Sequence, residues 1–145
     1  MPKMIRVGLR EIVNIDYSVV ERLLSGFLRY ELQSAGAKGF VVGLSGGLDS
    51  SVAYALAVKA VGRDRVLALI MPEASSTPPE DVADAMTVVN LFGGRSIVVD
   101  ITPIYSTFLS TIPDKTGDRI ALGNLKARIR MAVLYYYANT YNMLV

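Results

Sequence analysis

The stretch that decides the fold is Gly43-Leu44-Ser45-Gly46-Gly47-Leu48-Asp49-Ser50-Ser51, which overlaps the end of the apolar run Phe40–Leu44. A short, continuously apolar run suits a strand that is buried on both faces of a parallel sheet. Gly46 and Gly47 have no Cβ, so the backbone after the strand can turn sharply and bring its N–H groups close to an anion. The helix expected from Leu48 adds its free N–H groups and the positive end of its dipole. The stretch therefore predicts a strand, an anion-binding loop and a helix in succession.

Strand and helix alternate on both sides of this loop, and each crossover is long enough for parallel pairing. We expect strands at Phe40–Leu44, Val66–Met71 and Ser96–Ile101. We expect helices from Asp16 to near Gly36, from Leu48 to Ala60, from a Thr77–Glu80 capping box to about Phe92, from Thr102 to about Ile112, and from Asp118 or Asn124 to Tyr141. This order predicts one α/β domain over residues 1–145, a doubly wound parallel sheet with helices on both faces.

The last residues, Met143-Leu144-Val145, look like the start of a fourth strand. Two interpretations are open, a frayed apolar terminus packed on the core and a domain truncated at its fourth strand. We favour truncation, because a strand that stops after three residues cannot complete its pairing.

Composition narrows the chemistry. Hydrophobic residues make up 52% of the 145 residues and the net charge is +2, so we expect a folded domain without a nucleic-acid partner. No apolar run could span a membrane and no signal-peptide core follows the first charges, which favours a cytoplasmic protein. Cysteine and histidine are both absent, so a bound metal would need oxygen ligands, as magnesium does.

The loop alone cannot supply the affinity for a nucleotide. A helix terminus contributes about 0.3–1 kcal/mol to binding an anion, whereas micromolar affinity requires about 8 kcal/mol. Asp49 is the expected metal ligand, because a carboxylate beside phosphates repels them unless a cation bridges the two. In the simpler alternative the turn only joins strand to helix, and Ser45 or Asp49 caps the helix. No lysine follows the glycines, so the loop is not a Walker A loop.

The loop resembles the pyrophosphate-binding loop of the ATP-pyrophosphatases (the PP-loop superfamily), which include NAD, GMP and asparagine synthetases. The resemblance implies that ATP is split between its α- and β-phosphates and that the loop holds the departing pyrophosphate. It implies ATP-binding roles for Gly43, Leu44, Ser45, Gly46, Gly47, Leu48, Asp49 and Ser50.

A second segment, Gly123-Asn124-Leu125-Lys126-Ala127-Arg128-Ile129-Arg130-Met131, is similar to a segment of ammonia-dependent NAD synthetases. The similarity implies that deamido-NAD is amidated by ammonia through an adenylated nicotinate, with ATP as co-substrate, Mg²⁺ at Asp49 and no catalytic protein nucleophile. It also implies a homodimer whose interface contains this helix. The residues implied to bind deamido-NAD are Arg130, Asn124, Arg128 and Tyr135.

The helix itself is apolar around most of its circumference. Asn124, Arg128, Met131 and Tyr135 share one stripe, and we expect only the face with Lys126, Arg130, Val133 and Tyr137 to be partly solvated. A helix of this kind is normally buried. The pattern alone favours an ordinary core helix with solvated basic residues, whereas the resemblance implies that part of the helix contacts a second subunit.

Two functions of different class remain open from the sequence. The chain is either the front half of an active enzyme, or an ATP-binding and dimerising fragment without turnover. The resemblance places a second metal carboxylate, a threonine and several lysines beyond Val145, so we expect the 145 residues alone to be inactive. Another PP-loop ATP-pyrophosphatase is a further alternative, because the loop by itself identifies only the superfamily.

Overall fold

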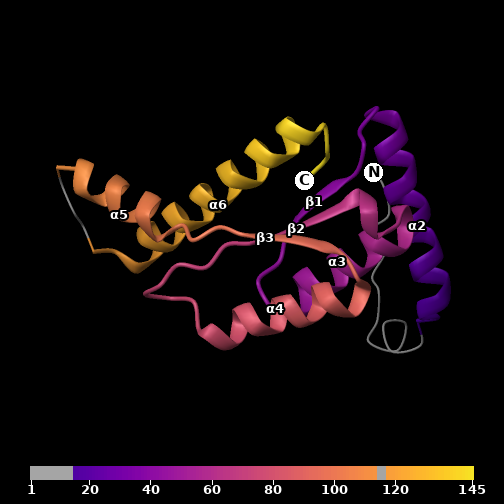
Figure 1. Cartoon of the computed structure of the whole chain (residues 1–145), viewed down its shortest axis with the longest axis horizontal. Helices are drawn as coiled ribbons and strands as arrows, with labels where there is room; N and C mark the ends of the chain where they lie inside the picture. Colours follow the sequence, from indigo (N-terminus) through magenta and orange to yellow (C-terminus); the bar gives the residue numbers. More distant parts are fainter. Residues whose placement is uncertain (1–14, 114–116) are drawn as a thin grey trace, which may run out of the picture.

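The computed structural model describes residues 15–113 and 117–145. Helices and strands alternate along the chain, as predicted (Figure 1). The elements are α2 (Tyr17–Ser34), β1 (Phe40–Gly43), α3 (Leu48–Val61), the 3₁₀ turn η1 (Arg63–Arg65), β2 (Val66–Ile70), α4 (Pro79–Phe92), β3 (Arg95–Val98), α5 (Thr102–Thr111) and α6 (Arg119–Tyr141).

The strands form one parallel sheet in the order β1-β2-β3, with Phe40 opposite Val66 and Leu67 opposite Arg95. Leu144 extends the sheet beyond β1. It forms a parallel bridge with Phe40, accepts a bond from the Val41 N–H at 2.7 Å and donates its own N–H to the Gly39 carbonyl at 2.9 Å. The residues expected to begin a fourth strand thus lie beside the first.

Helices cover both faces of the sheet (Figure 1). On one face α3 and α4 enclose a core that includes Val66, Ala68 and Ile70 of β2, and on the other α5 and α6 enclose a core that includes Leu67 and Leu69. All five residues of β2 are buried, because alternate side chains of this central strand enter opposite cores. The predicted doubly wound fold is confirmed, and α2 packs outside it on α3.

Two predicted boundaries are wrong. The capping box at Thr77 does not form: Pro78 is the N-cap of α4, and the Thr77 hydroxyl instead accepts a bond from the Glu73 N–H at 3.0 Å. The third strand runs from Arg95 to Val98, not from Ser96 to Ile101. The ladder ends early because Pro72 has no N–H to donate, so the bond from the Ile101 N–H to the Pro72 carbonyl has no counterpart.

The prediction that α6 is partly solvated on only one face, that of Lys126 and Arg130, is also wrong. Ile129 and Ala138 are buried against the sheet, and Lys126 turns with them, its side chain only 14% exposed. The exposed face carries the predicted stripe instead, with Met131 at 42% and Tyr135 at 54%. Basic residues can face the sheet here because each finds a buried oxygen acceptor, described below.

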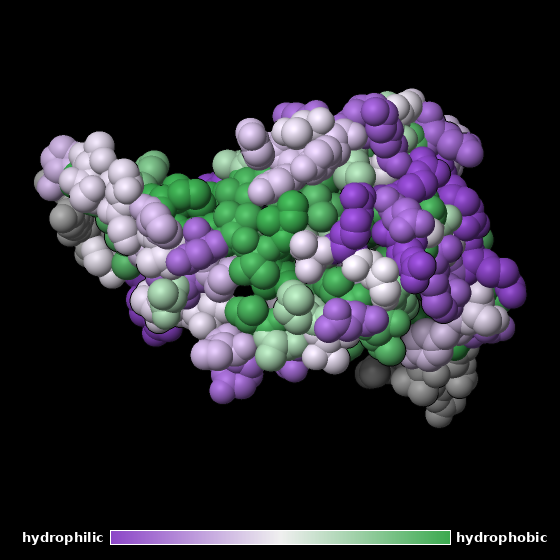
Figure 2. Space-filling model, in the orientation of Figure 1, coloured by the Kyte–Doolittle hydropathy of each residue, from purple (hydrophilic) through white to green (hydrophobic). Residues whose placement is uncertain are grey.

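Figure 2 shows apolar side chains gathered in the middle of one face of the molecule, over the sheet between α6 and α4. Several large apolar residues are exposed, among them Phe27 of α2 and Phe108 of α5. Within residues 15–113 and 117–145, no helix combines the length and the hydropathy needed to cross a membrane.

α3 and the start of β3 approach each other closely, and this contact predicts how two substitutions change the free energy of unfolding. A Cβ on Gly94 would lie 1.9 Å from the Tyr54 hydroxyl oxygen, a group that is buried and has no hydrogen-bond partner among the described residues. Gly94→Ala is expected to lower the free energy of unfolding by about 1–3 kcal/mol through overpacking. Tyr54→Phe is expected to be neutral or stabilising, because it removes an unsatisfied hydroxyl.

Urea unfolding of the two single variants and the double variant measures this coupling. In the Tyr54→Phe background, Gly94→Ala should cost less than it does in the wild type. An equal cost in both backgrounds would show that the Tyr54 hydroxyl is not the obstacle.

Candidate functional site

A cavity of about 370 Å³ lies where β1 and β2 end. Its lining comes from four places in the chain: the end of β1 and the loop, the end of β2, the start of α4, and α6. These residues are Gly43, Leu44, Ser45, Ile70, Met71, Pro72, Thr77, Asp81, Val82, Arg130 and Leu134. The carboxyl edge of a parallel sheet is where ligands of such folds bind, so the cavity is the candidate site.

The glycine-rich loop is held by its own serines. The Ser50 hydroxyl donates to the Gly47 carbonyl at 3.0 Å and accepts the Ser45 N–H at 3.2 Å, while the Ser45 and Ser50 hydroxyl oxygens lie 3.0 Å apart. The Ser51 hydroxyl also donates to the Gly47 carbonyl, at 2.8 Å. Three short polar side chains therefore fix the turn between β1 and α3 without using an apolar core.

The start of α3 leaves its donors free. Gly47 is the N-cap and no side chain caps the helix, so neither Ser45 nor Asp49 serves as a cap. Within the described part of the chain, the N–H groups of Gly46, Leu48, Asp49 and Ser50 find no acceptor. Donors of this kind, with the helix dipole behind them, suit an anion.

Gly46 holds the loop against α4. Its φ is +86°, a conformation that L side chains rarely adopt, and a Cβ there would lie 2.3 Å from the Asp81 carbonyl oxygen. Glycine is required at this position both for its backbone conformation and for the close approach. The position of the first turn of α4 thus determines where the loop can lie.

The structure separates the four residues predicted to bind deamido-NAD. Arg130 lines the cavity, and its Nε donates to the Met71 carbonyl at 2.9 Å. Asn124, Arg128 and Tyr135 lie on the exposed face of α6, away from the sheet. A ligand in the cavity can contact Arg130, whereas the other three residues face outward.

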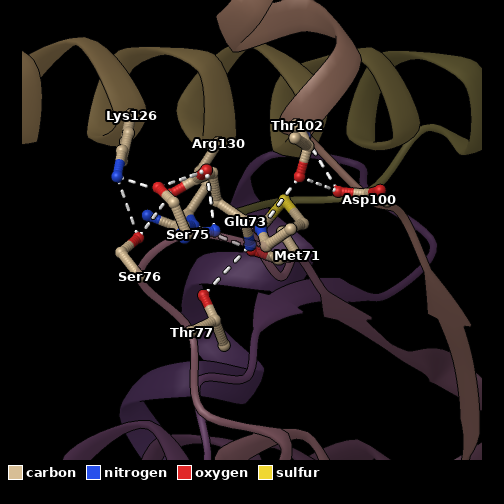
Figure 3. A network of polar contacts seen from close by, with 10 residues as sticks. Met71, Glu73, Ser75, Ser76, Thr77, Asp100, Thr102, Lys126 and Arg130 are labelled. Atoms are coloured by element: carbon tan, nitrogen blue, oxygen red, sulfur yellow. Dashed lines mark hydrogen bonds and ion pairs between the residues drawn. The ribbon is translucent and has the colours of Figure 1, made fainter.

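Glu73 is the hub of a polar network beside the cavity (Figure 3). Its carboxylate accepts the Ser75 N–H and the hydroxyls of Ser75 and Ser76, and it forms an ion pair with Lys126 of α6. Burial would raise the pKa of Glu73, but the bonds from Lys126, Ser76 and Ser75 outweigh it and lower the pKa to about 2. Glu73 is therefore ionised throughout the physiological range.

Lys126 is enclosed on three sides. Its Nζ contacts the Glu73 carboxylate, donates to the Ser76 hydroxyl at 2.9 Å and lies 4.8 Å from the centre of the Tyr105 ring. The sequence did not reveal the role of Lys126, because the helical wheel predicted that its face of α6 is partly solvated. The partner of Lys126 is Glu73, and its signal in the sequence was an acidic residue next to Pro72, directly after a buried strand.

Asp49 fits a hard cation by its chemistry. It lies in the first turn of α3, and its exposed carboxylate makes no hydrogen bond or ion pair within the described residues. The free N–H groups beside it favour an anion. A cation between that anion and the Asp49 carboxylate would be attracted by both negative charges. No group of three or more Asp or Glu residues that could hold a metal occurs in the described part of the chain, so a ligand or further residues would have to complete the coordination.

The parallel sheet, the uncapped start of α3 and the cavity beside them define an α/β domain with the PP-loop fold. The NAD synthase family model matches residues 19–145. The chain belongs to the NAD synthase family, which confirms the finer of the two resemblances.

Individual relatives agree with this assignment. An NH(3)-dependent NAD(+) synthetase from Aeropyrum pernix is 50% identical over 143 residues, a match that covers 97% of this chain and 50% of the relative. An NMN synthetase structure from Francisella tularensis is 34% identical with a TM-score of 0.83, covering 90% of this chain and 54% of that one. An NH3-dependent NAD synthetase structure from Campylobacter jejuni, in complex with nitrate, is 27% identical with a TM-score of 0.81, covering 90% and 56%. The chain thus spans about half the length of the relatives it matches.

The geometry at Gly46 generates a prediction with an internal control. Gly46→Ala is expected to reduce the free energy of unfolding by about 2 kcal/mol or more, since the strained φ and the approach to Asp81 add up. Gly47→Ala is the control, because φ is −76° there and the nearest atom to a Cβ is the Ser45 hydroxyl oxygen at 3.4 Å. Its cost should stay near 1 kcal/mol, the loss of a glycine N-cap. Denaturant unfolding compares the two, and equal losses would contradict the packing of Gly46 on α4.

Proposed function

We propose that this protein takes part in the ATP-dependent amidation of deamido-NAD by ammonia, which yields NAD, AMP and pyrophosphate. The observation that carries the proposal is the joint placement of the glycine-rich loop and Arg130 at one cavity in a chain of the NAD synthase family. The alternative from the sequence, ATP binding and dimerisation without turnover, applies to these 145 residues if the remaining catalytic groups lie outside them. The proposed location is the cytoplasm, where ATP is available.

The cavity can accommodate the nucleoside part of ATP. Leu44, Ile70, Met71, Val82 and Leu134 give it apolar walls, which suit the faces of a purine ring. The triphosphate would then extend toward the free N–H groups at the start of α3. Burial of the ring and hydrogen bonds to the phosphates together can supply the free energy that the loop alone lacks.

Two residues carry charge to the reacting region. Arg130 is half-buried at the cavity wall and keeps guanidinium N–H groups beyond the one donated to Met71, so it can contact an anionic oxygen. Asp49 would hold Mg²⁺, which neutralises phosphate charge when bound. The attack of a carboxylate on the α-phosphate needs alignment and charge stabilisation rather than a protein nucleophile. This requirement fits a chain without cysteine or histidine.

We further propose a homodimer through the exposed face of α6. Met131, Tyr135 and Tyr136 are 42%, 54% and 67% exposed, and large apolar side chains grouped in this way favour burial in an interface. Asn124 and Arg128 lie on the same face and would contribute polar contacts, so a dinucleotide bound there by these residues and Tyr135 would lie near the interface. Sedimentation of the purified protein tests this, and a monomer would contradict it.

The metal assignment predicts the effect of Asp49→Asn. ATP binding to the wild type should strengthen when Mg²⁺ is added, because the cation relieves repulsion between the carboxylate and the phosphates. Asp49→Asn should abolish this dependence on magnesium in calorimetry. Unchanged affinity with an unchanged magnesium dependence would show that Asp49 is not a metal ligand.

Exchange of pyrophosphate into ATP by the full-length protein tests the reaction. Exchange should require deamido-NAD, because the adenylated nicotinate must form before pyrophosphate can return. Nicotinate mononucleotide is the matched alternative acceptor, in view of the similarity to an NMN synthetase. Exchange supported by the mononucleotide alone would show that nicotinate mononucleotide, not deamido-NAD, is the acceptor. Exchange supported only by aspartate or xanthosine monophosphate would overturn the proposal.

A further inference from the structure

We propose that Glu73 and Lys126 are positioning residues for nucleotide binding: their buried ion pair ties the connection between β2 and α4 to α6 and so sets the width of the cavity. The proposal rests on the proposed function, because it assigns these residues to the ATP site. Neither side chain lines the cavity, so each would act through its neighbours.

Glu73 organises the whole connection between β2 and α4. Besides the carboxylate contacts, its carbonyl accepts the N–H groups of Ser76 and Thr77 at 3.0 and 2.9 Å, and its N–H donates to the Thr77 hydroxyl at 3.0 Å. The Ala74 N–H donates to the Thr102 hydroxyl of α5 at 2.9 Å. Thr77, the last residue bonded to Glu73, is also a residue of the cavity lining.

Two ties join the connection to α6, one turn of helix apart. Arg130 bonds the Met71 carbonyl at the beginning of the connection, and Lys126 bonds Glu73 and Ser76 further along it (Figure 3). Residues four apart lie on the same face of a helix, so the two ties act in parallel. Together they fix the distance between the walls contributed by α4 and by α6.

The position of α4 affects the position of the glycine-rich loop. Asp81, in the first turn of α4, lies against Gly46, where a side chain as small as a methyl group would collide with its carbonyl. A connection released from α6 would therefore shift a helix that is in backbone contact with the anion-binding loop. The pair can influence nucleotide affinity in this way without touching the nucleotide.

Burial strengthens the contact that the Glu73–Lys126 ion pair makes between this connection and α6. The Glu73 side chain is 2% exposed and that of Lys126 is 14% exposed, whereas both partners of the Glu21–Lys59 pair between α2 and α3 are about half exposed (50% for Lys59 and 45% for Glu21). Removing one partner of a buried pair leaves an uncompensated charge, while exposed pairs contribute little. Glu21→Gln is therefore a matched control, because it breaks an ion pair between two helices that do not line the cavity.

The experiment measures Mg-ATP dissociation constants by calorimetry on the full-length protein, at a temperature where denaturant unfolding shows each variant to be folded. Glu73→Gln and Lys126→Met should each weaken binding at least tenfold. The double variant should bind Mg-ATP no more weakly than the single variant with the higher dissociation constant, because both substitutions remove the same ion pair. Lys126→Arg, which keeps the cation, should restore most of the affinity, and Glu21→Gln should leave it unchanged.

Variants that lose stability but keep the wild-type affinity for Mg-ATP would overturn the inference, since the pair would then be only structural. Additive losses in the double variant would overturn it as well. If Glu73→Gln does not fold, Lys126→Met and Lys126→Arg decide the question, because the Ser75 and Ser76 donors remain on Glu73 in both. Failure of the wild type to bind Mg-ATP would instead refute the proposed function.

Discussion

Parallel pairing of β1 with β2 is the constraint on which the site depends. Parallel strands end at the same edge of a sheet, so the residues after Gly43 and after Ile70 must emerge side by side. β2 is buried on both faces and its register is fixed by two cores, which leaves the two loops little freedom to move relative to each other. The cavity exists because α4 and α6 then rise from opposite faces of this edge.

The polar residues at this edge are stable there only because each is partnered. Burying a carboxylate to 2% exposure without partners would cost free energy. Glu73 instead pairs with the Lys126 cation of α6 and accepts three hydrogen bonds from Ser75 and Ser76. The basic face of α6 is possible for the same reason. Lys126 and Arg130 turn toward the sheet because the connection after β2 offers them a carboxylate and a carbonyl.

Membership of the NAD synthase family and the geometry of the cavity support each other without being the same argument. The family match follows from sequence over residues 19–145, while the cavity follows from where four separate segments meet. The loop and Arg130 are brought together, whereas Asn124, Arg128 and Tyr135 face outward on the far side of α6. A site that uses all of them would need a ligand or a second subunit to bridge the two faces of that helix.

The sequence by itself determined the order of elements, the parallel sheet and the glycine-rich loop, because these depend on short-range patterns: continuous apolar runs, glycines with no Cβ and a helix start. It also indicated that Met143–Val145 begin a further strand, and the structure shows Leu144 bridged to Phe40 of β1. Only the tertiary structure decided which face of α6 is buried, and that Thr77 bonds Glu73 instead of capping α4. A helical wheel ranks faces by polarity, and a buried ion pair reverses that ranking. The partner of Lys126 lies 53 residues away in the chain, where no local pattern can reveal it.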